Sequence, residues 1–263
     1  MTVHLRRLGT LGGSLIIAAG VLVAPVQAAE ALLGLPAPTG GHRVGTTSVH
    51  LVDHSRPDPL APSPRARELM VRLWYPAMPS RQPVAPYQTL AVSGFYTAFL
   101  NATSGTSFPD DLLAFPTHSR ENAPVAGSRH PVVVFAPDSA GNGVDGTGLH
   151  EELASRGYVV VGIDHTFDAG AVEFPGGRIE TRKPDLVEDA ALREVRVADV
   201  RFVLDSLRGL GRVADLNRIA GFGHGTGALT ILDTMARDRR LDAGVVLNGD
   251  PLGTATLDRP VLL

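Results

Sequence analysis

The chain has 263 residues, 44% of them hydrophobic and 19% charged, which is enough apolar material for one large domain with a sizeable core. Its formal net charge of −3 gives no electrostatic reason to expect nucleic acid or an anionic membrane as a partner. It contains no cysteine, which excludes disulfides, thiolate metal sites and a cysteine nucleophile.

Residues 1–28 have the pattern of a secretory signal peptide. Arg6 and Arg7 precede an apolar run over 11–23, and the small-residue site Val26-Gln27-Ala28 predicts cleavage near Ala28. The apolar run is shorter than the roughly 20 residues that a spanning helix needs. We therefore expect a secreted, extracellular protein with no stable membrane insertion after signal cleavage. A short anchor that stays attached is the alternative.

The mature chain, residues 29–263, is expected to form a single domain. Residues 29–66 are rich in Pro, Gly and Ala and predict a leader that lies over the domain surface, with one strand at 47–52. A second strand is predicted at 69–75, with one face formed by Leu69, Val71, Leu73 and Tyr75. Residues 77–130 carry many prolines and predict long loops with one helix near 90–100.

The pattern becomes regular from residue 131 onward. Short apolar runs predict strands, which lie at 132–135, 159–163, 219–222, 244–247 and 260–263. Between them, apolar residues at helical spacing predict helices, namely one through Leu149 and Leu153 that Gly157 ends, one over 188–207 and one over 226–235. Residues 164–187 predict a loop. In the long helix, charged residues that alternate with apolar ones predict a solvated face, formed by Arg193, Arg196, Asp199 and Arg201.

This alternation of apolar strands and amphipathic helices predicts a doubly wound, mostly parallel α/β sheet with an antiparallel N-terminal edge from residues 47–75. Ligand sites in such sheets lie beyond the carboxyl ends of the strands. We therefore expect one crevice surrounded by the segments 137–143, 164–168, 223–227 and 248–250.

The most informative stretch is RIAGFGHGTGALTI at 218–231, which runs from a strand through a glycine-rich turn into a helix. It has the frame of the G-x-S-x-G elbow on which α/β-hydrolases mount their nucleophile. In this chain His224 and Thr226 flank Gly225, which stands where the serine is expected.

Four further segments carry the same resemblance, namely RELMVRLWYPA at 67–77, HPVVVFAPDSAG at 130–141, ELASRGYVVVGIDH at 152–165 and VEFPGGR at 172–178. With the elbow, they make the chain similar to the secreted bacterial lipases and esterases related to plasma-type platelet-activating factor acetylhydrolase. The resemblance implies an α/β-hydrolase fold and cofactor-free hydrolysis of carboxylic esters, often of lipids, by a Ser-His-Asp triad.

The chain departs from the triad at each member. Gly225 has no side chain that could attack, and Asn248 stands where the resemblance implies the acid; Asp250, two residues on, is either a substitute acid or a turn residue before Pro251. None of the nine histidines follows residue 248, where the order Ser, Asp, His requires the base. The sequence is therefore expected to be truncated at its C-terminal end relative to the family.

The expected crevice also holds an unusual oxyanion loop. Asp138 stands where the family tends to have glycine, and it either opposes a developing oxyanion beside the Ser139 N–H or turns to solvent as a turn residue. His224 and Thr226 are expected at the crevice. His165 either lines it or is a hydrogen-bonded histidine of the turn after its strand. No metal site is predicted, because one histidine with nearby acids is a poorly specific pattern.

Three hypotheses follow. The first is an active secreted ester hydrolase. The second, favoured by the lost triad members, is a catalytically impaired homologue that binds an ester or lipid without cofactor, or a decayed product. The third is a dinucleotide-binding protein, because Gly223, Gly225 and Ala228 satisfy the loose G-x-G-x-x-G/A pattern. Dinucleotide fingerprints normally sit on the first strand of their sheet, whereas several strands precede this one.

Overall fold

The computed structural model of the protein describes residues 34–183, 185–186, 190–249 and 257–263. The predicted signal peptide and Asp250 lie outside these residues. No helix within the described ranges is both long and apolar enough to cross a membrane.

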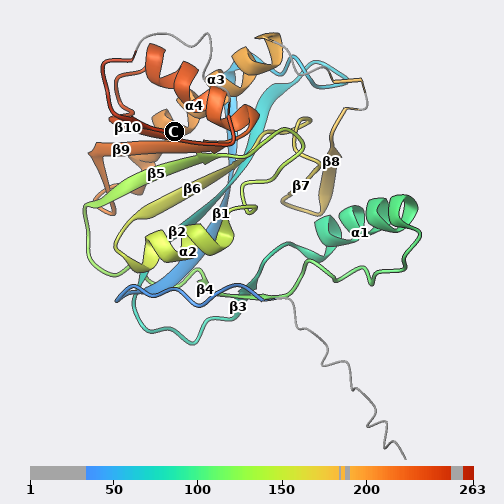
Figure 1. The fold of residues 1–263 in the computed structure, drawn as a ribbon, viewed down its shortest axis with the longest axis horizontal. Helices are drawn as coiled ribbons and strands as arrows, with labels where there is room; N and C mark the ends of the chain where they lie inside the picture. The colour runs from blue at the N-terminus through green and yellow to red at the C-terminus, as the bar shows by residue number, and fades with distance from the viewer. Residues whose placement is uncertain (1–33, 184, 187–189, 250–256) are drawn as a thin grey trace, which may run out of the picture. The chain divides into compact units, whose positions relative to one another are not determined.

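One large sheet organises the described part of the chain (Figure 1). Its strands run in the order β11-β10-β9-β5-β6-β2-β1-β4-β3. In chain order their bounds are β1 Arg43–Pro57, β2 Ala66–Ala77, β3 Val84–Pro86, β4 Pro116–Glu121, β5 His130–Ala136, β6 Val159–Asp164, β9 Ala214–His224, β10 Ala243–Leu247 and β11 Val261–Leu262. The strands from β11 to β6 are mutually parallel, and β2 joins β6 antiparallel. The predicted doubly wound, mostly parallel sheet is confirmed.

The central strands are apolar on both faces because helices cover both faces. In β5, Val132 and Val134 belong to the core cluster under α3 (Ala190–Ser206) and α4 (Thr226–Arg237), whereas Val133 and Phe135 belong to the cluster under α2 (Thr147–Ser155). Figure 1 shows α3 and α4 on one side of the sheet and α2 on the other. As predicted, Gly157 follows the end of α2, with a positive φ of 102°.

The N-terminal part of the sheet differs from the prediction. β1 and β2 pair antiparallel as expected, but they are not the edge, because β4 pairs parallel with β1 and β3 pairs with β4. The region predicted as a loop at 164–187 contains a hairpin, β7 (Ala171–Phe174) and β8 (Arg178–Thr181). Its turn uses Gly176 and Gly177, both with φ near 80°. Helix α1 (Leu90–Ser104) begins where predicted.

The long helix α3 corrects a second prediction. Arg193 and Arg201 are partly exposed, but Arg196 is 1% exposed and Asp199 is fully buried. These two residues therefore do not belong to a solvated face. They face charged partners that come from distant parts of the sequence, which the helical periodicity alone cannot reveal.

Candidate active site

The turn between β9 and α4 has the backbone of a nucleophile elbow. His224 is the last residue of β9, Thr226 is the first of α4, and Gly225 between them has φ 53° and ψ −123°. The Gly225 N–H donates to the Leu247 carbonyl at 2.9 Å, which ties the elbow to the end of β10. A residue with a side chain is strained in this conformation by on the order of 1–3 kcal/mol. Gly225 removes that strain.

A carboxylate fills the space that an elbow side chain would enter. A Cβ added to Gly225 would lie 2.2–2.4 Å from the carboxylate atoms of Asp138, which follows β5. Oδ1 of Asp138 accepts the backbone N–H of Ser139 and that of Thr226, each at 2.8 Å. In hydrolases of this fold, such N–H groups stabilise the oxyanion of the tetrahedral intermediate. Here the Asp138 carboxylate occupies them, and it faces the elbow although its side chain is 43% exposed.

The electrostatics favour the ionised form of Asp138. Partial burial alone would raise the pKa of this carboxyl, but the N–H donors of Thr226 and Ser139 and the nearby His224 outweigh burial and lower the pKa below its usual value. His224 Nδ1 lies 3.7 Å from Oδ2, the oxygen that the backbone donors leave free. The positive end of the α4 dipole acts in the same direction.

A cleft of about 510 Å³ opens beside the elbow. Apolar side chains form much of its wall, and they are Phe135, Phe222, Leu149 and Leu247. Among the described residues that line it, Asp138, Asp145 and His224 are titratable. Leu149 and Leu247 are 45% and 39% exposed, so apolar surface is available to a ligand. A cleft with apolar walls and a few polar groups at one end is typical of a site for a small organic molecule.

The structure brings most of the predicted site residues together. Asp138, Ser139 and His224 line the cleft, and Gly225 and Thr226 form the elbow beside it. The Ser139 hydroxyl donates to Asp168 Oδ1 at 3.2 Å and accepts from Arg182 Nη1 at 2.7 Å.

The predicted acid positions do not join this cluster. Asn248 is exposed, has φ 52°, and makes no side-chain hydrogen bond to another described residue. Asp250, the alternative acid, lies outside the described residues.

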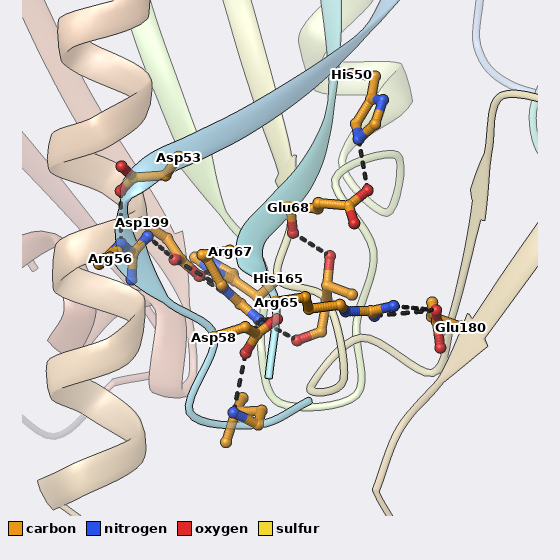
Figure 2. A network of polar contacts seen from close by, with 12 residues as sticks. His50, Asp53, Arg56, Asp58, Arg65, Arg67, Glu68, His165, Glu180 and Asp199 are labelled. Atoms are coloured by element: carbon orange, nitrogen blue, oxygen red, sulfur yellow. Dashed lines mark hydrogen bonds and ion pairs between the residues drawn. The ribbon is translucent and has the colours of Figure 1, made fainter. Parts of the chain in front are cut away.

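His165 is a correction, because it does not line the cleft. It is 1% exposed, and its Nδ1 lies 2.9 Å from Oδ2 of Asp199. Figure 2 shows it beside the ion pairs that Arg67 makes with Asp58 and Asp199. The loop after β6 therefore sends its side chains into a buried charge cluster.

Sequence reasoning missed several contributors to the cleft, among them Asp145, Phe135, Leu149 and Phe222. Phe135 was assigned only to its strand and Leu149 only to the core face of its helix. Phe135 and Leu149 lie close in sequence to the predicted crevice segment 137–143, and this proximity could have indicated that they line the cleft. The described residues contain no group of three His, Asp or Glu side chains arranged to hold a metal ion. The N-terminus of α4, where a dinucleotide pyrophosphate would bind, already holds the Asp138 carboxylate.

The order of strands, the helices on both faces and the elbow between β9 and α4 define an α/β-hydrolase fold. No family model matches the sequence. A solved structure, a ferulic acid esterase from Streptomyces cinnamoneus, is 39% identical, superposes with a TM-score of 0.76, and is matched over 88% of this chain and 67% of its own.

Two relatives by sequence have related names. One is named probable 1-alkyl-2-acetylglycerophosphocholine esterase, from Arthroderma benhamiae, and is 29% identical over 84% of this chain and 60% of its own length. The other is the platelet-activating factor acetylhydrolase of Cavia porcellus, 21% identical over 68% of this chain and 49% of its own length. The chain belongs to the esterase family of the α/β-hydrolase type, and it spans about half to 60% of the length of these two relatives.

Proposed function

We propose that this chain is an ester-binding member of its family in which the elbow supplies no covalent nucleophile. The observation that carries the proposal is the Asp138 carboxylate, which occupies the space beside Gly225 and accepts both N–H groups that an acyl intermediate would need. A triad hydrolase acylates its elbow side chain and stabilises the resulting oxyanion with those N–H groups. Neither the attacking atom nor the free donors are present in this arrangement.

The proposed ligand is a small carboxylic ester. The names of the relatives refer to esters of ferulic acid and of acetylated glycerophosphocholine, and the cleft offers apolar walls next to polar groups at the elbow. Leu149 and Leu247, which are partly exposed in the cleft, suit the acyl or aryl part of such a ligand. No cofactor enters the proposal.

Replacing Gly225 with serine is expected to create no acyl-enzyme. The new Cβ would lie 2.2 Å from Asp138 Oδ1, and the serine would be strained at φ 53°. We expect no burst of p-nitrophenol from p-nitrophenyl butyrate and no mass increase after treatment with a fluorophosphonate, a reagent that labels activated serines.

The double variant Gly225→Ser with Asp138→Gly is the matched comparison, because it removes the carboxylate that blocks the new side chain. Gly225→Ala controls for the backbone strain alone. The proposal would be wrong if the single Gly225→Ser variant were labelled by the fluorophosphonate and showed a burst. Such a result would show that the elbow still activates a nucleophile.

We also propose that the protein is exported. The basic, apolar and small-residue regions of residues 1–28 support the proposal. Expression of the full chain in a bacterial host with a Sec pathway is expected to yield a mature protein that begins at Ala29, measured by N-terminal sequencing of the exported fraction. An exported or membrane-bound product that retains Met1 would contradict cleavage.

A further inference from the structure

The two oxygens of the Asp138 carboxylate have different surroundings. Oδ1 accepts the N–H groups of Ser139 and Thr226, which fix the position and rotation of the carboxylate. The Thr226 hydroxyl contributes a further hydrogen bond to Asp138. Oδ2 faces Nδ1 of His224 at 3.7 Å. A carboxylate held in this way can orient an imidazole and stabilise its protonated form.

His224 is placed to act on a ligand. It ends β9, its side chain is 47% exposed, and it lines the cleft together with Leu247 and Phe222. With Nδ1 turned to Asp138, the other ring nitrogen, Nε2, makes no hydrogen bond to another described residue. Hydrogen bonds between catalytic groups are often long in a ligand-free site and tighten when the substrate is bound.

We propose that His224, positioned by Asp138, activates a water molecule for direct attack on an aryl ester bound in the cleft. The inference rests on the proposed function, because it needs an ester in this cleft and no nucleophile at the elbow. It assigns His224 as the catalytic residue and Asp138 as its positioning residue. The two occupy different places from those of the family's triad.

The reaction balances without a co-reactant other than water. As the water oxygen forms a bond to the ester carbonyl carbon, Nε2 of His224 takes a water proton and the carbonyl electron pair moves onto its oxygen. The tetrahedral intermediate then reforms the carbonyl and breaks the bond to the aryl oxygen. The imidazolium of His224 returns its proton to the phenolate, which leaves a carboxylic acid and a phenol.

The occupied N–H groups determine which esters can react. Because Asp138 holds the Ser139 and Thr226 donors, the intermediate receives no help from them. A phenolate leaves readily, whereas an alkoxide is a much poorer leaving group. The dyad of His224 and Asp138 therefore selects aryl esters over alkyl esters of the same acid.

The charges around His224 support a proton-accepting role. Asp138 and Asp145 each interact with it electrostatically, and the described residues that line the cleft include no Arg or Lys. Oδ2 of Asp138 faces Nδ1 of His224, so a negative charge lies next to the ring whose Nε2 takes the water proton. Asp145 also lines the cleft and accepts the backbone N–H of Asn142 at 2.8 Å, and burial raises the pKa of its carboxyl to about 6.

The test uses the full chain with p-nitrophenyl butyrate as the aryl ester and ethyl butyrate as the alkyl ester. We expect steady turnover of the aryl ester without a burst, a solvent deuterium isotope effect on kcat, and no turnover of ethyl butyrate. His224→Gln and Asp138→Asn are each expected to lower kcat on the order of 10²-fold or more with KM nearly unchanged. Asp138→Asn keeps an acceptor oxygen for the two N–H groups, and thermal unfolding verifies that both variants fold.

Glu194→Gln is the matched control, since it removes a carboxylate from a surface ion pair with Arg237 on α3 and α4, away from the cleft. It is expected to leave kcat and KM unchanged. Hydrolysis in ¹⁸O water followed by mass analysis of the Asp138 peptide tests the attacking group. Labelled Asp138 would overturn water attack, because it would show that the carboxylate itself attacked the ester.

A binding measurement distinguishes failure of this inference from failure of the proposed ester-binding function on which it rests. The probe is 4-nitrobutyranilide, an amide of the same shape that resists hydrolysis, and binding is measured by calorimetry. Binding of the anilide with no ester turnover, or with unchanged turnover in His224→Gln, would overturn the dyad and leave ester binding intact. Absence of both binding and turnover would overturn the two proposals together.

Discussion

Asp199→Asn is expected to destabilise the protein by about 3–5 kcal/mol, because it leaves buried positive charge without its main partner. The Asp199 side chain is fully buried on α3 and accepts from Arg67 Nη2 at 2.7 Å, from Arg67 Nε at 3.1 Å and from His165 at 2.9 Å, while Arg56 adds a further ion pair (Figure 2). Arg67 is itself fully buried, with Asp58 as its second carboxylate. The measurement is the free energy of unfolding from urea denaturation.

Glu194→Gln provides the control on the same helix. Glu194 pairs with Arg237 at the surface, so the same acid-to-amide change is expected to alter stability by no more than about 0.5 kcal/mol. An Asp199→Asn effect equally small would contradict the view that this buried cluster joins α3 to the β1–β2 pair.

The same carboxylate predicts a pH dependence with a definite sign. Burial alone would raise the pKa of Asp199, but the Arg67 guanidinium and the His165 hydrogen bond outweigh burial and hold the pKa far below its ordinary value of 3.8. A lowered pKa contributes stability that is complete above the ordinary value and is lost as the pH falls below it. The free energy of unfolding of the wild type, measured by urea denaturation, should therefore fall more than that of Asp199→Asn as the pH is lowered below 3.8.

The sequence predicted the elements whose pattern reflects burial on both faces. The runs VVVF in β5 and VVVGI in β6 predict strands without knowledge of what packs on them, because a strand covered by helices on both sides is apolar throughout. β4 was missed because its buried residues are polar. Thr117 and Ser119 face inward, and the Ser119 hydroxyl is satisfied by Glu151 on α2, a partner 32 residues away.

The candidate site was predictable in position but not in arrangement. The glycine frame at 223–227 and the place of Asp138 after β5 were readable, since the carboxyl ends of parallel strands meet at one edge of the sheet. The direction of the Asp138 carboxylate could not be predicted, because it depends on two backbone N–H groups, one of them 88 residues away. The sequence left two places open for His165, because its partner Asp199 is 34 residues away on a face predicted to be solvated.

Gly227→Ala is expected to destabilise the protein by about 3 kcal/mol or more and to disrupt the elbow. The added Cβ would lie 2.0 Å from the Ala136 carbonyl oxygen and 2.4 Å from that of Pro137. Both are backbone atoms at the end of β5, so relief requires α4 to move away from the strand that leads into Asp138. The hydrogen bond from the Thr226 N–H to Asp138 would lengthen with that shift.

The matched control for Gly227→Ala is Gly148→Ala in α2, where the added Cβ would have a single neighbour, Leu35 Cδ2, at 3.9 Å. Alanine is favoured over glycine in a helix by up to about 1 kcal/mol, so this variant is expected to be neutral or more stable. Urea denaturation measures both variants. Because the elbow holds Asp138 through Thr226, Gly227→Ala should also weaken binding of 4-nitrobutyranilide, whereas Gly148→Ala should not. Equal stabilities for the two variants would mean that α4 and the end of β5 do not pack closely, which would remove the structural basis for a carboxylate held at the elbow.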